Sequence, residues 1–323
     1  MMKNSIYLIC ILWVAAWQQT SAQSQIDYPH CGCVEKVNVA TDDKEKWDGT
    51  YELICKGKQI VSGQYKQGIK TGKWITKTPK GTVIKASEFS DGKLHGKYEL
   101  FYYDGTPKLT ANFVNGQEDG LWQYFNDKGK VIKTGSYQSG KPIGVWSISD
   151  KAGRKIVATY NLDTEEFKNT IVPPYYKSGG IDRDDQSGEW YIKYPMEGHS
   201  KTSVSPLGGY DLSRDLFLKY LPIPSTLMDT YTNFKFIITL ELERNTIKSI
   251  KATMPENSNF NSVGLIYPFI VSTNRPGKLH RVEHTARSIQ LLQDDIVEAI
   301  RVMGPWIGNS TTEIQIPFVL NEM

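Results

Sequence analysis

The sequence predicts a mainly β protein, in which an antiparallel meander of 24-residue β-hairpin repeats is followed by a small α+β domain. The first observation is a Gly-x-aromatic motif whose glycines are 23, 24, 24 and 24 residues apart: Gly49, Gly72, Gly96, Gly120 and Gly144. A second glycine series and an aromatic-x-x-Gly motif keep the same period. The second observation is that this pattern stops near residue 160, after which helical and strand periodicities alternate.

Each unit contains two short stretches of alternating apolar and polar residues, separated by turn signals. In the third unit, Asp104-Gly105 follows the first stretch and Asn115-Gly116 follows the second. Period-two alternation with such turns is typical of β-hairpins. We therefore expect five repeats over residues 47–160, with about ten strands and one buried face. The glycine and the aromatic residue of each motif should be structural: Gly72, Trp74, Gly96, Tyr98, Gly120, Trp122, Gly144 and Trp146.

A small residue precedes each second-strand aromatic by two positions: Gly63, Ser87, Ala111, Gly135 and Ala158. Residues two apart lie on the same face of a strand. We expect the large ring of a neighbouring strand to lie across each small residue, because large and small side chains interdigitate in a close-packed core. The repeat aromatics are then core residues rather than a stacking platform for sugars or bases.

These motifs resemble MORN-type repeats, most closely the bacterial YwqK-like version, over residues 48–160. The resemblance rests on Gly-Lys-Trp/Tyr, on Asp-Gly followed eight residues later by Phe, and on Asn-Gly-x-x-x-Gly. It implies the repeat fold and a protein-binding scaffold, and it leaves peripheral association with a membrane open. The YwqK-like version is also associated with antitoxins, which are expected in the cytosol. No catalytic residue comes with the motif.

Residues 1–22 have the features of a secretory signal peptide. Lys3 precedes an apolar stretch, Ile6 to Trp17, and Thr20-Ser21-Ala22 offers a cleavage site. The stretch is shorter than the roughly 20 residues that a membrane-spanning helix needs. We expect cleavage before Gln23 and export to the periplasm or the outer membrane, with retention as an uncleaved anchor as the alternative.

Three cysteines remain after cleavage: Cys31, Cys33 and Cys55. Exported proteins meet an oxidising compartment, so a disulfide from Cys31 or Cys33 to Cys55 is expected. This disulfide would link the cap segment, residues 23–46, covalently to the first repeat. The alternative is a metal site that includes His30, but structural zinc sites usually combine spaced ligand pairs.

The charge is uneven along the chain. Residues 41–160 carry 20 Lys and Arg against 13 Asp and Glu, a net +7, whereas residues 161–323 carry 16 against 20, a net −4. A basic half could meet nucleic acid, an anionic lipid surface or an acidic protein. We favour solvent-facing lysines that keep the array soluble, because the lysines are spread over every unit. No nucleic-acid partner is expected.

Residues 161–205 predict a linker or irregular segment, because Pro173-Pro174 and Gly179-Gly180 are loop signals. Residues 188–194 could add one repeat-like strand. Asp182-Arg-Asp184-Asp185 has the acidic spacing of a calcium loop, but the glycine and the bidentate glutamate of such loops are missing. A solvated acidic turn is favoured.

Residues 206–323 predict an α-β-β-α-β order. The expected elements are a helix over 211–220, strands over 234–243 and 247–253, a helix over 294–303 with two acids in its first turn, and a strand over 312–320. Residues 254–289 form a long insertion. Within it, His280 and His284 could share a helix face as metal ligands, although a catalytic zinc site needs three protein ligands.

This order resembles the C-terminal domain of TonB-type proteins. The matching stretches are Pro206-Leu-Gly-Gly-Tyr210, the hairpin from Phe234, Ala299 to Gly308, and Ile314 to Leu320. The resemblance implies a buried Trp306, with Pro317 before the last strand. It also implies a module that pairs its edge strands with partner peptides near the outer membrane. The chain has no long Pro-rich linker, so binding is favoured over energy transduction.

No phosphate loop, Gly-x-Ser-x-Gly or His-Glu-x-x-His motif is present in the sequence. We expect no enzyme and no cofactor. The predicted function is an exported binding or scaffold protein in the envelope of a Bacteroidetes-like bacterium, with protein partners. The alternatives are a TonB-like transducer that contacts an outer-membrane receptor, a YwqK-like antitoxin-type protein, and an enzyme or metal-dependent protein.

Overall fold

The computed structural model describes residues 23–30, 33–40, 46–150, 152–169, 181–183, 190–192, 204–208, 222–224, 233–256, 271–273, 280–282 and 285–320. The predicted signal peptide, Cys31, His284, the predicted helix over 211–220 and most of the acidic turn after Asp182 lie outside the described residues.

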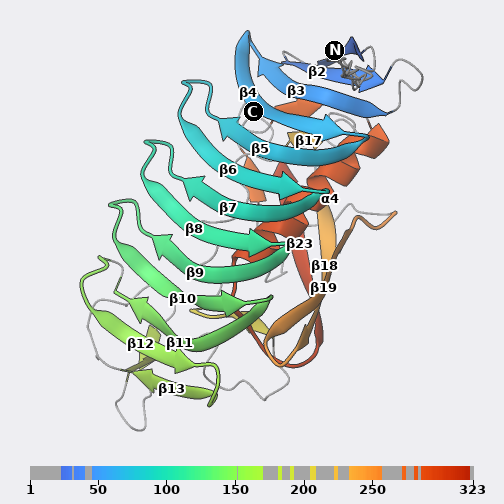
Figure 1. Cartoon of the computed structure of the whole chain (residues 1–323). Coiled ribbons are helices and arrows are strands. Elements are labelled where there is room, and N and C mark those ends of the chain that lie inside the picture. Colours follow the sequence, from blue (N-terminus) through green and yellow to red (C-terminus); the bar gives the residue numbers. More distant parts are fainter. Residues whose placement is uncertain are drawn as a thin grey trace, which may run out of the picture.

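Thirteen strands form one antiparallel meander in which each strand pairs with the next along the chain (Figure 1). They are β1 (Gln23–His30), β2 (Cys33–Ala40), β3 (Trp47–Cys55), β4 (Lys58–Lys66), β5 (Ile69–Lys77), β6 (Val83–Ser90), β7 (Lys93–Phe101), β8 (Pro107–Val114), β9 (Gln117–Phe125), β10 (Val131–Gln138), β11 (Lys141–Ser149), β12 (Ile156–Asn161) and β13 (Glu166–Asn169). The predicted meander is confirmed. It has more strands than expected, because the cap segment forms β1 and β2 and the predicted linker contributes β13.

Two-residue turns along one edge of the sheet connect consecutive repeats. Asn115 and Gly116 both have positive φ, 52° and 82°, as a type I′ hairpin turn requires. The N–H of Gly116 also donates to the carbonyl of Leu94 at 2.7 Å, and the equivalent glycines Gly68, Gly92 and Gly140 make the same kind of bond one repeat back. These turn glycines therefore fasten each hairpin to the preceding one.

The small residues of the second strands lie beneath large rings, as predicted. A methyl group added at Gly135 would overlap the indole of Trp146, and one added at Gly63 would overlap the indole of Trp74. Trp74 also packs edge-on against Tyr65, with ring centroids 5.1 Å apart. The aromatic residues of the Gly-x-aromatic motif are buried, which confirms that they form the core of the array.

The C-terminal part contains a four-stranded sheet of order β19-β18-β23-β20 and the helix α4 (Thr285–Val302). Its strands are β18 (Asn233–Glu243), β19 (Thr246–Thr253), β20 (Val271–Thr273) and β23 (Thr311–Leu320). Three short pairs complete the described strands: β14 (Ile181–Arg183) with β15 (Trp190–Ile192), β16 (Ser205–Pro206) with β22 (Trp306–Ile307), and β17 (Pro222–Pro224) with β21 (His280–Val282). The predicted hairpin, helix and closing strand are therefore present.

Several finer predictions for this region are wrong. Helix α4 begins at Thr285 rather than at Asp294, so Asp294 and Asp295 lie mid-helix and its first turn contains no acid. His280 lies in β21, before the helix, so it does not share a helix face with His284. Pro317 lies inside β23, opposite Lys235, rather than before the strand.

Two further predictions for this part of the chain are wrong. The stretch around Trp190 forms β15, which pairs with β14 and does not extend the large sheet. The predicted insertion over 254–289 ends within the helix, because residues 285–289 belong to α4.

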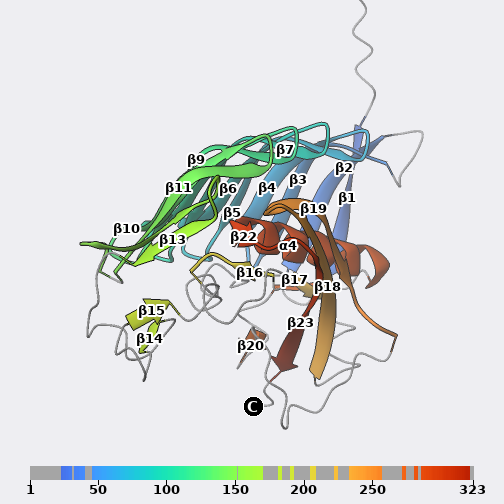
Figure 2. The same ribbon diagram turned by 90° about the horizontal axis from the view of Figure 1, so that it is seen from below.

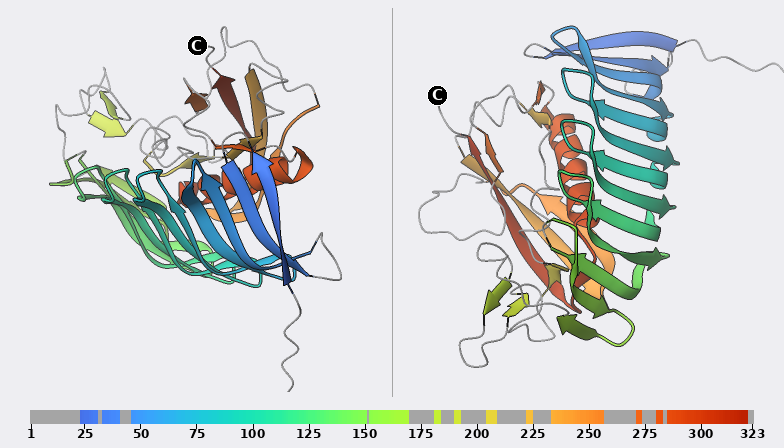
Figure 3. Two further views of the ribbon diagram at one scale, coloured as in Figure 1. Left: turned by 90° about the horizontal axis from the view of Figure 1, so that it is seen from above. Right: turned by 90° about the vertical axis from the view of Figure 1, so that its left-hand side faces the viewer.

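Helix α4 lies between the concave face of the large sheet and the small sheet (Figures 2 and 3). One face of the helix, with Leu292, Ile296 and Ile300, packs into a core with the strand residues Phe236 and Leu240. The opposite, polar face is turned to the large sheet. The position of α4 therefore depends on which polar and charged partners the concave face of the large sheet provides for the helix.

Trp306 follows the helix and is buried, as predicted. Its indole N–H donates to the carbonyl of Ile300 at 2.8 Å. The residue is 1% exposed and belongs to the core between α4 and the small sheet. It thereby ties the end of the helix to the segment that enters β22.

Substitution Gly135→Ala should destabilise the protein by about 1–3 kcal/mol, because the added methyl overpacks the contact with Trp146. The matched control is Ser87→Ala. It lies at the same repeat position and already carries a Cβ, so it should cost less than about 1 kcal/mol. Urea unfolding of the three proteins measures both effects. If Gly135→Ala were as stable as wild type, the contact with the Trp146 indole would not require a residue without a side chain at position 135.

Candidate binding cleft between the repeat sheet and helix α4

Two columns of repeat residues face inward from the concave side of the sheet. One column stands two residues before the motif glycine: Trp47, Lys70, Leu94, Glu118 and Pro142. The other stands four residues after the second-series glycine: Val61, Lys85, Leu109, Lys133 and Val157. Most members are apolar, as core positions should be. The charged members lie opposite helix α4 and the segment that follows it.

Lys85 of β6 holds the middle of the helix. Its ammonium forms an ion pair with Glu298 and lies 3.8 Å from the Oδ1 of Asp295. The hydroxyl of Tyr98 donates to the Oε1 of Glu298 at 2.7 Å. Burial alone would raise the pKa of Glu298, but the Lys85 ammonium and these hydrogen bonds hold it below its ordinary value. Glu298 is therefore ionised when it meets the sheet.

Glu118 of β9 forms the next contact along the helix. Arg301 Nη1 donates to its Oε1 at 3.0 Å, and the Glu118 side chain is only 2% exposed. Burial raises the pKa of Glu118, and the Arg301 guanidinium partly offsets that effect. Loss of Arg301 would leave a buried carboxylate without its partner, which is costly.

Lys133 of β10 binds the backbone just beyond the end of α4. Its Nζ donates to the carbonyls of Gly304 at 2.9 Å, Met303 at 3.0 Å and Leu207 at 3.4 Å. It also lies 4.0 Å from the ring centroid of Tyr124. The ammonium thus satisfies carbonyls at the negative end of the helix dipole. Burial lowers the pKa of Lys133 to about 7.

Tyr124 completes this capping arrangement. Its hydroxyl lies 2.6 Å from the carbonyl oxygen of Gly304 and 3.0 Å from that of Val302, and it donates to these acceptors. Val302 and Leu207 also pack in one core with the aromatic residues of the later repeats. Through Lys133 and Tyr124, the repeat sheet terminates a helix that belongs to the C-terminal part.

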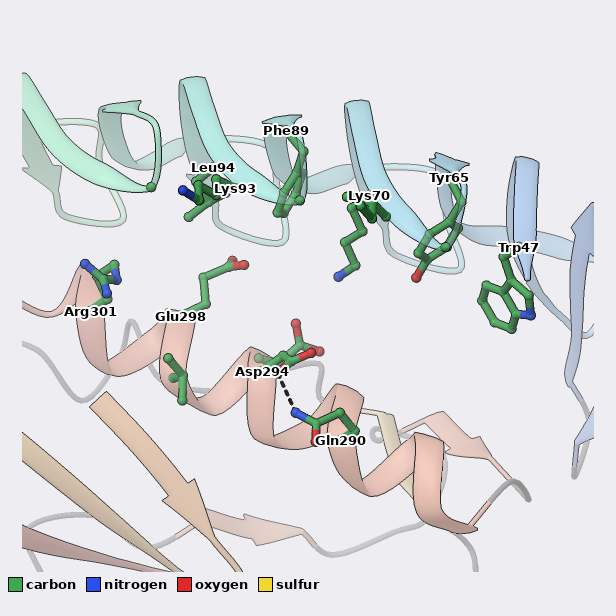
Figure 4. Close-up of a pocket in the computed structure, with 16 residues that line it drawn as sticks. Trp47, Tyr65, Lys70, Phe89, Lys93, Leu94, Gln290, Asp294, Glu298 and Arg301 are labelled. Atoms are coloured by element: carbon green, nitrogen blue, oxygen red, sulfur yellow. Dashed lines mark hydrogen bonds between the residues drawn. The ribbon is translucent and has the colours of Figure 1, made fainter. Parts of the chain in front are cut away.

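Nearer the start of the sheet, α4 and the concave face leave a cleft of about 760 Å³ (Figure 4). Helix side chains, including Gln290, Asp294 and Glu298, point across it toward the strands. The sheet side contributes aromatic, aliphatic and basic side chains and three turn glycines: Trp47, Tyr65, Gly68, Ile69, Lys70, Phe89, Gly92, Lys93, Leu94 and Gly116. The helix side contributes Gln290, Asp294, Asp295, Val297, Glu298 and Arg301. The volume falls in the range of ligand-binding clefts.

Two of the three aromatic residues that line the cleft, Trp47 and Tyr65, present little ring surface. Trp47 is 3% exposed and Tyr65 is 7% exposed, because both pack in the core of the first repeats. The Lys70 ammonium lies 4.8 Å from the ring centroid of Trp74 and 5.4 Å from that of Phe89. The accessible chemistry of the cleft is therefore mainly that of its charged and aliphatic side chains.

The predicted disulfide at Cys55 is confirmed, because Cys55 is disulfide-bonded. The strand register places Cys33 directly opposite it, across β2 and β3. Cys31 lies outside the described residues. Within the described part of the chain, no group of three or more His, Cys, Asp or Glu side chains is arranged to hold a metal ion. Nor does any helix there combine the length and hydropathy of a membrane span.

The interpretation of the repeat lysines as solvent-facing is wrong at Lys85 and Lys133. Both point inward and meet the C-terminal part. A signal was available in the sequence, since these lysines occupy a column that holds Val61, Leu109 and Val157 in the other repeats. A charge at a core position of a repeat indicates a partner, because an unpaired buried charge is costly.

Comparisons with known proteins give no functional assignment. No family model matches the chain, and no curated protein matches it. Structural similarity is found to a glycine-to-arginine mutant of S. aureus TarM in complex with fondaparinux, alpha-GlcNAc-glycerol and UDP. The sequence identity is 16%, the match covers 34% of this chain and 19% of that chain, and the TM-score is 0.22. A second TarM structure has 13% identity, covers 45% of this chain and 21% of its own, and gives a TM-score of 0.21.

A third similar structure contains accessory secretory proteins 1, 2 and 3 of Streptococcus pneumoniae. It has 17% identity, covers 31% of this chain and 20% of that chain, and gives a TM-score of 0.20. This chain therefore spans about a fifth of the length of each of these structures.

Between pH 7.5 and 9.5, the free energy of unfolding should rise by up to about 1.4 kcal/mol per pH unit through Lys133. The sign follows because its pKa is lowered to about 7 in the folded state, so the unfolded chain binds more protons in this window. The rise should be absent in Lys133→Met. It should remain in the control Lys141→Met, which changes an exposed lysine.

Urea unfolding at several pH values measures this slope. The upper limit avoids the titration of the buried tyrosines, whose pKa is raised by burial and whose contribution is lost only above pH 10. The same slope in wild type and Lys133→Met would contradict the assignment to Lys133.

Proposed function

We propose that this chain is an exported, non-enzymatic binding protein of the bacterial cell envelope, and that the cleft between the repeat sheet and helix α4 is its binding site. The proposal rests mainly on one observation. The sheet holds α4 and the segment after it through Lys85, Glu118 and Lys133, and a cleft lies open beside these contacts. Ligand sites occur preferentially at such junctions between packed units. The predicted signal peptide supports the location.

The repeat sheet acts in this proposal as a rigid support rather than as a second free surface. The inner face of its later repeats is already occupied, since Trp122 and Trp146 share a core with Leu207 and Val302. Only the part over the first repeats borders the cleft. Partner binding through the sheet is therefore assigned to this region.

A second candidate is a TonB-like module that binds a peptide by strand addition. One observation favours it: among the described strands, β19 pairs with β18 alone and forms an edge of the small sheet. An edge strand presents unpaired backbone groups to a partner strand. The MORN-like, YwqK-like and TonB-like assignments remain proposals that rest on the sequence motifs.

A photo-crosslinking amino acid at Ile69 tests the primary proposal in the native host. Ile69 lines the cleft and is 47% exposed. The matched control is Leu121, which is 57% exposed and is not among the residues that line the cleft. Irradiation should give a defined adduct at Ile69 and none at Leu121.

The adduct is identified by mass spectrometry, together with the N-terminus of the recovered protein. A single adduct at Ile69 on a chain that begins at Gln23 and fractionates with the periplasm or the outer membrane is the expected result. Equal labelling at both positions, or none at Ile69, would argue against the cleft as a binding site.

A further inference from the structure

The charged residues of the cleft fall into two groups. Asp295, Glu298 and Arg301 are engaged with the sheet, through Lys85 and Glu118. In contrast, Lys93 and Asp294 form no ion pair with any described residue. Lys70 lies over aromatic rings and its charge acts on Asp295 and Glu298, whereas Asp294 accepts a hydrogen bond from Gln290 at 2.9 Å. Lys93 and Asp294 are therefore the charged side chains available to a ligand.

The available charges lie on opposite walls. Lys93 belongs to strand β7, whereas Asp294 belongs to helix α4, and Figure 4 shows the two walls facing each other. Aliphatic side chains lie on both walls, with Ile69 and Leu94 on the sheet and Val297 on the helix. A complementary ligand carries both signs of charge and an apolar group between them.

Three other ligand classes fit this arrangement less well. A polyanion would face Asp294, Asp295 and Glu298 on the helix wall. An acyl chain would remove charged side chains from water without pairing them, which is costly. A sugar would need an exposed ring face for stacking, and the indole of Trp47 is 3% exposed.

We propose that the cleft binds a short extended peptide segment that carries both a basic and an acidic side chain. The basic side chain meets Asp294, the acidic side chain meets Lys93, and an apolar residue between them packs on Ile69 and Val297. This inference rests on the proposed function and adds the chemical class of the ligand.

Selection of phage-displayed random heptapeptides on the purified full chain tests this assignment. Enriched peptides should contain a basic and an acidic residue flanking an apolar one. The best peptide, labelled with fluorescein, is then titrated by fluorescence anisotropy. Asp294→Lys should weaken its binding at least tenfold, because attraction becomes repulsion at a close charge pair. Lys93→Glu should weaken it by a similar factor.

Two matched controls carry the same charge changes away from the cleft. Glu313→Lys changes an exposed acid on β23, and Lys141→Glu changes the lysine that follows the turn glycine two repeats after Lys93. Both should bind as wild type does. A peptide whose basic residue is replaced by Glu should regain affinity for Asp294→Lys. Unchanged urea midpoints establish that all four variants fold.

The proposal is overturned if no heptapeptide is enriched, if enriched peptides are uniformly acidic or uniformly apolar, or if Asp294→Lys binds like Glu313→Lys. Failure here together with a defined adduct at Ile69 would reject only the peptide class and leave the cleft as a binding site. Failure of both experiments would reject the cleft itself. The two proposals are therefore separable.

Discussion

The structure depends on one contact: the polar face of helix α4 is buried against charged residues of the repeat sheet. An amphipathic helix on one sheet normally turns its polar face to water. Here Glu298 and Arg301 meet Lys85 and Glu118, and Lys133 binds the carbonyls at the end of the helix. The position of α4 and the open cleft beside it follow from these pairings, since each offsets part of the cost of burying a charge.

The geometry of a repeat sheet suits this role. The contacts follow the order of the strands: Lys85 of β6 meets Glu298, Glu118 of β9 meets Arg301, and Lys133 of β10 meets the carbonyl of Gly304. The contact also changes how the array is stabilised. In an isolated repeat array, the free energy of unfolding is nearly the sum of the contributions of its units. Here, Leu207 and Val302 join the core of the later repeats. Those repeats are coupled to the C-terminal part, and additivity is not expected across them.

Periodicity in the sequence was sufficient to predict the meander, its turns and the pairing of Trp146 with Gly135, because these features depend on neighbours in the array. It failed where the partner comes from elsewhere in the chain. Lys85 and Lys133 were interpreted as solvent-facing, because lysine on a strand usually is. The start of α4 was placed at Asp294, because two acids suggest a first turn. Lys85, Lys133 and Asp295 serve long-range contacts. The signal for the two lysines appears only when the repeats are aligned and their column is seen to hold Val61, Leu109 and Val157.

A double-mutant cycle on Glu118 and Arg301 tests the docking of α4 most directly, with Glu118→Gln, Arg301→Gln and the double variant unfolded in urea. Docking predicts a coupling free energy of at least about 1 kcal/mol, as expected for a partly buried pair in contact. The exposed pair Glu243 and Lys248 should give a much smaller coupling in the same cycle, because solvent screens the two charges. A coupling for Glu118 and Arg301 no larger than for the exposed pair would contradict the docking of the helix on the sheet.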